Sequence, residues 1–452
     1  MFLSSKIKEF QPMIDWIESN QSSGGMIFWD DKKKFDAWDH FECLTALAIL
    51  GRKKSFLKGL DWFVDNFKIK EIFIGDLIYD RYIRTENKYL YPKLRDKKFL
   101  KLLFFGILKV ITLKKIFDLY DIKISLVGSK SYISMSSLIL RISQQRKIKS
   151  LFLAGFGYKI FDSKNKYDYD DPLKNSIIST RKKVNKTFLK NESNKYFNKK
   201  LKVKLNYNKK KGIILYDEKY WKDFKEYPKF TKELIEKKKK YSKLIIFASH
   251  SFSENNHYTG NIVFRDYFQH FLETLRFAKN DKKNLWLFKL HPASNEKYTE
   301  LKSSREVLKK KLKENILMVP LKYNNELLFK QADLVISTRG TICLEAATFG
   351  INNIITTKSF FSGFGFTDIK NNKKKYFRSF KKKQTFKKLS NNSINCAKEI
   401  LYLSKKIYRD NLFNILPVRR LLNKKQFNNE LKRISTKKDL DQRYDNMINK
   451  IL

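Results

Sequence analysis

The chain has 452 residues, and its 96 Lys and Arg against 46 Asp and Glu give a formal net charge of +50. This length allows two or three domains with sizeable cores, and a hydrophobic share of 42% excludes a disordered chain. Its three cysteines, Cys43, Cys343 and Cys396, are far apart and odd in number, which excludes a disulfide framework and a cysteine-based zinc site. We therefore expect a protein of the reducing cytosol.

The positive charge has three explanations: a solvated surface, attraction to an anionic membrane surface or polyanionic acceptor, and nucleic-acid binding. Most basic residues are Lys rather than Arg, and the charge is spread along the chain with local runs at 182–211, 237–240, 309–313 and 370–388. Abundant Lys, Asn and Ile are also typical of an AT-rich genome, which needs no ligand. A solvated surface is therefore favoured first and anionic lipid or acceptor second, whereas nucleic acid is disfavoured.

No predicted segment crosses a membrane. Residues 1–20 alternate apolar and charged side chains, so they lack the apolar core of a secretory signal. The longest apolar candidate, Phe99–Leu113, is interrupted by Lys101 and Lys109 and is shorter than the ~20 residues of a span. We expect a buried or interfacial helix there, and a cytoplasmic protein that is soluble or peripheral at the inner face of the cytoplasmic membrane.

The first 67 residues predict a helical appendage, because apolar residues recur at helical spacing in 10–17 and again through 38–67. The stretch GGMIFWDDKKKFDAWDHFECLTALAILGR (24–52) resembles one helical repeat of the terpenoid-cyclase and prenyltransferase-like α/α toroids. A toroid needs several repeats to close its core, so the resemblance implies no cyclase chemistry. Packing of a helical hairpin is the favoured explanation of the Trp-Asp-His triplet at 38–40.

From Lys68 short apolar runs alternate with amphipathic stretches. The run Glu71–Ile74 predicts a buried strand that ends in a polar loop at Gly75-Asp76. The next expected elements are a helix at Phe99–Leu113, a strand at Ile122–Val127, a helix at Ile133–Ile142 and a strand at Ser150–Ala154. This alternation indicates parallel βαβ units with ligand loops after the strands. Residues 158–242 are interpreted as a basic insert and connector with a helix at Tyr227–Lys240.

A second α/β unit begins with the strand Leu244–Ala248, which ends in a loop that contains Ser249, His250, Ser251 and His257. Further strands are predicted at Leu285–Leu290, Ile316–Val319, Leu334–Ile336 and Ile351–Ile355. Helices are predicted at Arg265–Lys279, Ser303–Lys313, Asn324–Gln331 and Thr341–Phe349, and in the tail 390–452.

The expected fold class is α/β, with two Rossmann-like domains facing a cleft in the GT-B manner. The expected parts are a helical appendage at 1–67, a Rossmann-like domain with the basic insert and connector at 68–242, a second Rossmann-like domain at 243–405 and a helical tail at 406–452.

The strongest candidate site is Ser337–Ala346, where a strand turns through small hydroxyl residues and a glycine into a helix. The first N–H groups of a helix have no partner within it and its dipole is positive there, so an anion can bind. The contributing residues would be Ser337, Thr338 and Thr341 as hydroxyl donors, Arg339 as a charge, Gly340 for close backbone approach, and Glu345 for ribose hydroxyls. A capped helix without a ligand explains the same segment.

His291 stands at another strand end, followed by Pro292, where an imidazole can donate a hydrogen bond to a phosphate leaving group. A core or turn histidine explains a lone His-Pro pair equally well, but its combination with Ser337–Ala346 in one βα unit favours phosphate binding. Ser249 and His250 are further candidate phosphate contacts.

On the acceptor side, Asp76 or Asp80 is the candidate base for an acceptor hydroxyl, and a turn aspartate that caps the following helix is an equally good explanation. The two histidines of the loop after Ala248, His250 and His257, have no Cys or clustered carboxylates near them in the sequence, so a metal site is not predicted there. No metal and no cofactor are expected besides a nucleotide-sugar co-substrate.

Six pieces of sequence, in order, carry a family resemblance: IGDLIYDRYIR (74–84), ASHSFSENNHYTG (248–260), FRDYFQHFLETL (264–275), FKLHP (288–292), ISTRGTICLEAATFG (336–350) and FFSGFGFTD (360–368). Residues 71–370 thereby resemble the bacterial capsule and surface-polysaccharide biosynthesis proteins, GT-B-type transferases related to Kdo- and sialyl-transferring enzymes. The resemblance implies that His291, Ser337 and Thr338 hold the nucleotide phosphate and that Glu345 binds ribose. It also implies that the domain at 68–242 takes the acceptor and that the domain at 243–405 binds the nucleotide sugar.

The function expected from the sequence is a glycosyltransferase of surface or capsular polysaccharide biosynthesis. It would move a sugar from a nucleotide-activated donor to a glycan or lipid-linked acceptor without metal. The alternatives are a polyol-phosphate transferase of the teichoic-acid type, a nucleotide-sugar epimerase, and a non-catalytic polyanion-binding protein. The expected partners are the donor, the acceptor and an anionic membrane surface, and nucleic acid is not expected.

Overall fold

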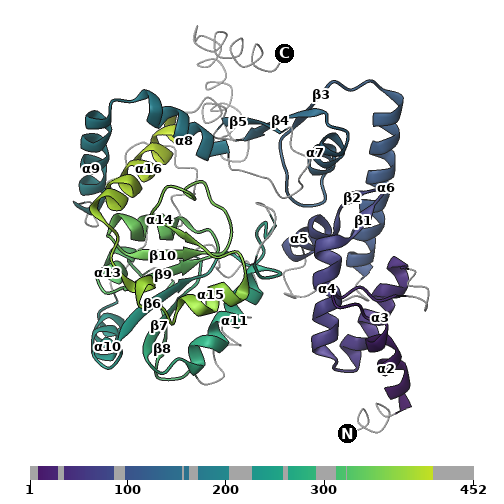
Figure 1. The fold of residues 1–452 in the computed structure, drawn as a ribbon, viewed down its shortest axis with the longest axis horizontal. Helices are drawn as coiled ribbons and strands as arrows, with labels where there is room; N and C mark the ends of the chain where they lie inside the picture. The colour runs from purple at the N-terminus through teal and green to yellow at the C-terminus, as the bar shows by residue number, and fades with distance from the viewer. Residues whose placement is uncertain are drawn as a thin grey trace, which may run out of the picture. The chain divides into compact units, whose positions relative to one another are not determined.

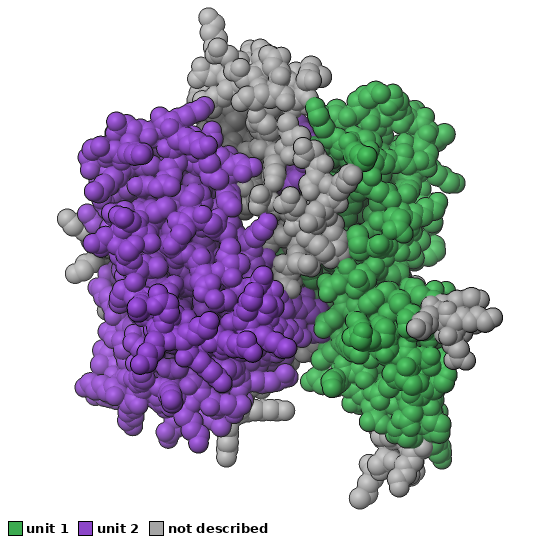
Figure 2. Space-filling model, viewed as in Figure 1, with its two compact units in different colours: residues 1–150, 162–166, 253–258 green, residues 151–161, 167–252, 259–452 purple. Residues whose placement is uncertain are grey.

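The structure is a computed structural model of the chain. It describes residues 9–28, 35–85, 97–154, 157–161, 172–202, 227–257, 263–291, 312–321 and 323–410. The chain forms two compact units (Figure 2). Unit 1 comprises residues 1–150, 162–166 and 253–258, and unit 2 comprises residues 151–161, 167–252 and 259–452.

Unit 1 begins with the helices α2 (Gln11–Ser19), α3 (Ala37–Ile49) and α4 (Lys53–Asn66), which confirm the helical character expected there (Figure 1). The side chain of His40 holds this part together from within the core. Its Nδ1 accepts a hydrogen bond from the Ile27 N–H at 3.2 Å, and its Nε2 lies 3.2 Å from the Gly59 carbonyl oxygen. Burial lowers the pKa of His40 to about 4, so the neutral ring acts as a structural link.

The predicted strand at Glu71–Ile74 is only partly confirmed. Strands β1 (Lys68–Ile69) and β2 (Ile72–Phe73) form an antiparallel pair, and the two residues between them have positive φ angles of 45° and 67°. Helix α5 (Gly75–Thr85) follows at once, so Asp76 lies in its first turn and not in a loop. A tight two-residue turn can join antiparallel strands, whereas parallel strands need a long crossover. The expectation of a parallel βαβ unit at this point is therefore wrong.

The long helix α6 (Lys97–Leu119) and helix α7 (Met135–Gln145) complete the helical core of unit 1. Strand β3 (Ile124–Val127) lies between them in the chain, as expected, and β4 (Lys149–Ala154) and β5 (Gly157–Phe161) follow α7 in the chain.

Unit 2 is built on a sheet in which every described pair of neighbouring strands is parallel. The strands are β6 (Lys243–Ala248), β7 (Asn284–Lys289), β8 (Ile316–Met318), β9 (Leu334–Ser337), β10 (Asn352–Ile355) and β11 (Asp368–Ile369), in the spatial order β11-β10-β9-β6-β7-β8. Counted from β6, this is the strand order 3-2-1-4-5-6 of the doubly wound Rossmann fold. The α/β class is confirmed, while the pair of Rossmann-like domains around a cleft stays a prediction.

Helices cover both faces of this sheet. The described helices of unit 2 are α8 (Pro172–Lys183), α9 (Lys186–Lys202), α10 (Pro228–Lys238), α11 (Tyr267–Asn280), α13 (Asn325–Phe329), α14 (Thr341–Thr348), α15 (Lys373–Ser379) and α16 (Asn391–Asp410), with a short 3₁₀ turn at Lys383–Phe386. Helices α8 and α9 pack against α16. Along β6, Leu244 and Ile246 join the core that includes α14 and α16, whereas the ring of Phe247 contacts His270 and Phe271 of α11. A strand buried on both faces appears in the sequence as an unbroken apolar run, which is why these strands were predictable.

Helices α8 and α9 occupy the part of the insert for which the sequence predicted no structure. Buried Leu173, Ile177 and Leu189 anchor them in the core of unit 2, and the Arg181 guanidinium pairs with the Glu399 carboxylate of α16 at 2.8 Å. Residues 301–311, which hold most of the predicted helix Ser303–Lys313, and residues 411–452 of the tail lie outside the described residues. Among the described helices, none has the length and apolarity that a bilayer crossing requires.

Candidate functional site

Three polar loops of unit 2 start at one edge of its sheet. The register pairs Ala248 of β6 with Lys289 of β7 and with Ser337 of β9, so the loops that follow these strands begin side by side. The strand order reverses at β6, and open α/β sheets bind ligands in the crevice outside the carboxyl ends at such a switch point. The structure thus brings together the segments around Ser249, His291 and Ser337 that the sequence singled out.

The first two loops place His250 and His291 against each other. Their rings are stacked, with centroids 5.5 Å apart and an interplanar angle of 13°. Burial lowers the pKa of His250 well below its usual value, and the positive charges of Arg339 and His291 lower it further. The edge therefore carries a positive potential that an anionic ligand would relieve.

The hydroxyl of Ser249 is a further donor at this edge. The Ser249 side chain is buried, and its backbone N–H donates to the Lys289 carbonyl oxygen at 2.9 Å. Its hydroxyl oxygen has no hydrogen-bond partner among the described residues. A buried hydroxyl without a partner costs free energy, which a ligand oxygen would recover.

The third loop leads into the N-terminus of α14. Gly340 is the N-cap residue, and no side chain caps the helix. The Gly340 N–H donates to the Ser337 hydroxyl oxygen at 3.2 Å. A Cβ atom on residue 340 would lie 2.7 Å from that oxygen, so a larger residue there would require the Ser337 hydroxyl to move. Thr341 is exposed and Arg339 is half-buried beside it.

Thr338 takes part in a buried network of side-chain hydrogen bonds that was not predicted from the sequence. Its Oγ1 lies 3.0 Å from Nδ1 of His270 on α11, and Nε2 of His270 lies 3.0 Å from the Tyr376 hydroxyl on α15. That hydroxyl also lies 2.8 Å from Oγ1 of Thr274. Burial lowers the pKa of His270 to about 3, so the ring is neutral and fixes the orientation of the Thr338 hydroxyl.

Glu345 lies one turn further into α14 and is half-buried. Its Oε2 accepts a hydrogen bond from Nδ2 of Asn325 at 3.2 Å. Lys289 is close enough for their charges to interact: burial lowers its pKa to about 8, and the Glu345 carboxylate opposes this change. The ammonium group of Lys289 donates to the Tyr323 carbonyl oxygen at 3.0 Å. Lys289 stands in the motif FKLHP, but it was assigned no role from the sequence, because a lysine at the end of an apolar strand does not reveal its partners.

In unit 1, the two predicted acceptor-side aspartates have different partners. Both oxygens of Asp76 accept from the guanidinium of Arg141, each at 2.7 Å, and both side chains are buried. The same guanidinium donates to the Phe73 carbonyl oxygen at 2.6 Å. Asp76 is therefore half of a buried ion pair that ties α5 to α7 and β2.

Asp80 is paired with His257, which the sequence placed in the same loop as Ser249 and His250. Oδ1 of Asp80 lies 2.8 Å from Nδ1 of His257, and Oδ2 accepts from the His257 backbone N–H at 3.0 Å. Burial alone would lower the pKa of His257, but the charge and hydrogen bond of Asp80, helped by Asp76 and Asp65, raise it to about 9. Nε2 of His257 is buried and has no hydrogen-bond partner among the described residues.

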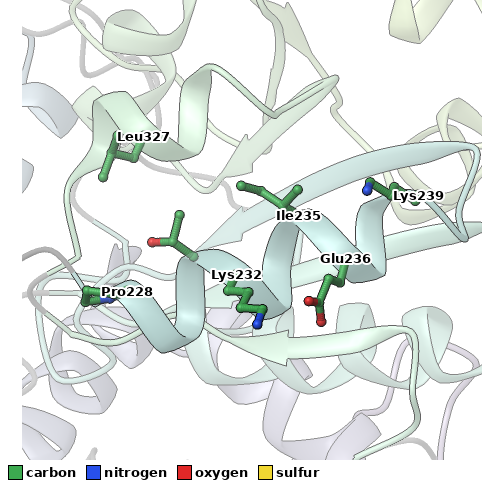
Figure 3. Close-up of a pocket in the computed structure, with 7 residues that line it drawn as sticks. Pro228, Lys232, Ile235, Glu236, Lys239 and Leu327 are labelled. Carbon is green, nitrogen blue, oxygen red and sulfur yellow. The ribbon is translucent and has the colours of Figure 1, made fainter.

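A pocket of about 550 Å³ lies elsewhere on unit 2 (Figure 3). It is lined by one side of α10, including Lys232, Ile235 and Glu236, and by Leu327. None of the predicted site residues lines it. Among the described residues, no group of three or more His, Cys, Asp and Glu side chains is arranged to hold a metal ion.

No family model and no curated protein matches the chain. Solved structures that it resembles include two of Thermosulfurimonas dismutans KpsC. The match to its beta Kdo 2,4 transferase has 12% sequence identity, covers 61% of this chain and 78% of that chain, and has a TM-score of 0.32; the match to its beta Kdo 2,7 transferase has 14% identity, covers 65% of this chain and 79% of that chain, and has a TM-score of 0.31. A third is UDP-GlcNAc 2-epimerase from Neisseria meningitidis bound to UDP-GlcNAc, with 14% identity, coverage of 67% of this chain and 81% of that chain, and a TM-score of 0.30. Each TM-score is below 0.5, and we base no assignment on these likenesses.

Proposed function

We propose that the chain is a glycosyltransferase and that unit 2 binds the phosphate of its nucleotide-sugar donor at the carboxyl ends of β6, β7 and β9. The observation that carries the proposal is the stacking of His250 and His291 at the strand ends, with the charge of Arg339 near enough to lower the pKa of His250 and with an α14 N-terminus that no side chain caps. This edge lies at the switch point of the sheet and carries hydrogen-bond donors, positive charge and a buried Ser249 hydroxyl without a partner among the described residues. Such a site can bind a phosphate.

Sugar transfer breaks the bond between the anomeric carbon and the donor phosphate oxygen and forms a bond from that carbon to the acceptor oxygen. The leaving phosphate keeps the electron pair, so negative charge develops where His291, Arg339 and the first amides of α14 are proposed to donate. Thr338, held by His270, and Ser249 would add hydroxyl donors. Glu345 would accept from the ribose hydroxyls. In this proposal, these groups stabilise the leaving phosphate without a metal ion.

The acceptor hydroxyl must also lose its proton. Asp76 is unsuited to receive it, because both of its oxygens are occupied by Arg141. We propose that the pair of Asp80 and His257 serves instead, with the proton taken by Nε2 of a neutral His257 and Asp80 stabilising the resulting cation. Because the pKa of His257 is raised to about 9, the neutral fraction and the transfer rate should rise with pH toward that value.

Following the family resemblance of its motifs, we propose a glycan or lipid-linked glycan of a surface polysaccharide as acceptor. The test is product analysis with the full chain and a panel of CMP-, UDP- and GDP-sugars. A new glycosidic bond supports the proposal, whereas a new phosphodiester identifies a polyol-phosphate transferase and an inverted free donor identifies an epimerase.

The assigned leaving-group role is tested by His291→Ala, for which we expect transfer to fall by ~10²–10³-fold, as for loss of one oxyanion donor. The exposed Arg276→Ala on α11 is the control and should leave transfer unchanged. Equal turnover of His291→Ala and the wild type would reject the role.

A further inference from the structure

Helix α6 presents an unusual face to solvent. It has 23 residues and is therefore ~34 Å long. In the view of Figure 1, α5, α7 and the β1–β2 pair all lie on the same side of α6. Its inward residues are buried in the core of unit 1 and are Phe99, Gly106, Val110, Leu113 and Phe117. An ordinary surface helix would present polar residues on the opposite face.

The outward face of α6 is apolar in its middle. The exposed fractions of Phe104, Phe105 and Leu108 are 59%, 44% and 42%, and that of Leu119 at the end of the helix is 77%. The two phenylalanine rings lie edge to face with centroids 5.6 Å apart, so they form one raised apolar ridge. At 3.6 residues per turn, these positions line up on the face opposite the buried one. Exposed apolar area of this kind marks a surface that meets a protein or a membrane.

Lysines flank the ridge at both ends. Lys97 and Lys101 precede it and Lys115 follows it, all of them exposed and on the same face. The ammonium group of Lys101 lies 5.8 Å from the centroid of the Phe105 ring, so charge and apolar surface are contiguous. The one acidic residue within the helix, Asp118, is paired with Arg146.

We propose that this outward face of α6 binds an anionic lipid bilayer, with Phe104, Phe105 and Leu108 inserted among the acyl chains and the flanking lysines on lipid phosphates. Lysines around an apolar ridge are the chemistry of an interfacial helix on anionic lipid, and each lysine adds to the attraction. A lysine's long stem can lie along the apolar layer while its charge stays at the phosphates. The net charge of +50 draws the whole chain toward such a surface.

A second copy of the chain fits this face less well than a bilayer does. Two-fold pairing of antiparallel α6 helices would bring Lys97 and Lys101 of one copy toward Lys115 of the other. Like charges placed around an apolar contact oppose association. Lipid phosphates complement the same lysines.

The test is co-sedimentation of the full chain with phosphatidylglycerol-containing vesicles and with phosphatidylcholine vesicles, at low and high salt. A chain of this charge will bind anionic vesicles non-specifically at low salt, so the decisive comparison is between variants of equal charge. We expect Phe104→Ser/Phe105→Ser to lower the vesicle affinity at least ~10-fold, because two inserted rings are lost. The control is Phe188→Ser on α9, which has a similar exposed fraction of 51% and should bind like the wild type.

The contribution of the lysines is tested by Lys101→Gln/Lys115→Gln against Lys374→Gln/Lys375→Gln on α15, a pair with the same change in charge. The substitutions of Lys101 and Lys115 should weaken binding to phosphatidylglycerol vesicles more than those of Lys374 and Lys375.

The proposal is overturned if the Phe104→Ser/Phe105→Ser variant binds vesicles as the wild type does, or if the wild type is a dimer that this variant dissociates. All the altered positions, on α6, α9 and α15, are exposed, so unchanged thermal unfolding will show that every variant is folded.

Discussion

Asp76 and Asp80 lie one helical turn apart on α5, and both are buried. Their local sequence is too similar to distinguish them, so the sequence made either one the candidate base. Their partners differ: Arg141 is 65 positions from Asp76, and His257 is 177 positions from Asp80. What each carboxylate can do is decided by these distant partners, which no local pattern reveals.

The ion pair of Asp76 and Arg141 leads to a prediction about stability. Asp76→Ala should lower the free energy of unfolding by ~3–5 kcal/mol, because it leaves the Arg141 charge buried and unpaired. The double variant Asp76→Leu/Arg141→Met should be less destabilised than the sum of its two single changes. Urea denaturation followed by circular dichroism measures both.

The exposed pair of Asp121 and Lys123 provides the control. Asp121→Ala should change the free energy of unfolding by less than ~1 kcal/mol. If Asp76→Ala were as stable as the wild type, the structural role of Asp76 would be contradicted.

The pair of Asp80 and His257 leads to a prediction about pH. The pKa of His257 is raised from 6.5 to about 9 in the folded chain, so the folded state holds its proton more tightly than the unfolded state. The resulting stabilisation is complete below pH 6.5 and is lost as the pH rises from 6.5 to 9.

Thermal unfolding of the wild type and of His257→Gln from pH 6 to 8 measures this effect. The difference in stability between the two should shrink steadily across this interval. Lys289, whose pKa is lowered to about 8, is present in both proteins, so the comparison cancels its contribution. A difference that stays constant with pH contradicts the assigned protonation.

At the scale of elements, the strand–turn–helix of β9 and α14 was predictable, because an apolar run, small residues and an amphipathic stretch follow one another directly. The elements behind it were predicted only in part. Helix α11 was expected, but the sequence did not show that His270 on it reaches Thr338, 68 positions away, or Tyr376 on α15, 106 positions away. An aromatic residue at a buried helical position indicates packing and does not identify its hydrogen-bond partner.

The network leads to a prediction at this scale. Tyr376→Phe removes the hydroxyl shared by His270 and Thr274 and leaves two buried polar atoms unpaired. The free energy of unfolding should fall by ~1–3 kcal/mol in urea denaturation. The half-buried Tyr402→Phe, whose ring contacts Tyr196, is the control and should change little. Equal stability of Tyr376→Phe and the wild type would falsify the network as drawn.

At the scale of the whole molecule, the α/β class and most elements of unit 2 followed from the sequence, because strands buried on both faces are unbroken apolar runs. Strand β11 was missed because it has only two residues. The β1–β2 pair was misjudged for the same reason, since a two-residue strand has no period to read. Helices α8 and α9 were missed because lysines and asparagines obscure the few apolar residues that anchor them.

The central claim is that the strand-end edge of unit 2 binds a nucleotide phosphate, and calorimetric titration of the full chain with CMP, CDP, UDP and GDP tests it most directly. We predict that at least one nucleotide binds, and that Arg339→Ala lowers its affinity at least ~10-fold through the loss of a charge-assisted contact. The control Arg276→Ala should bind it as the wild type does. Absence of binding for all four nucleotides, or equal affinity of Arg339→Ala and the wild type, would contradict the claim.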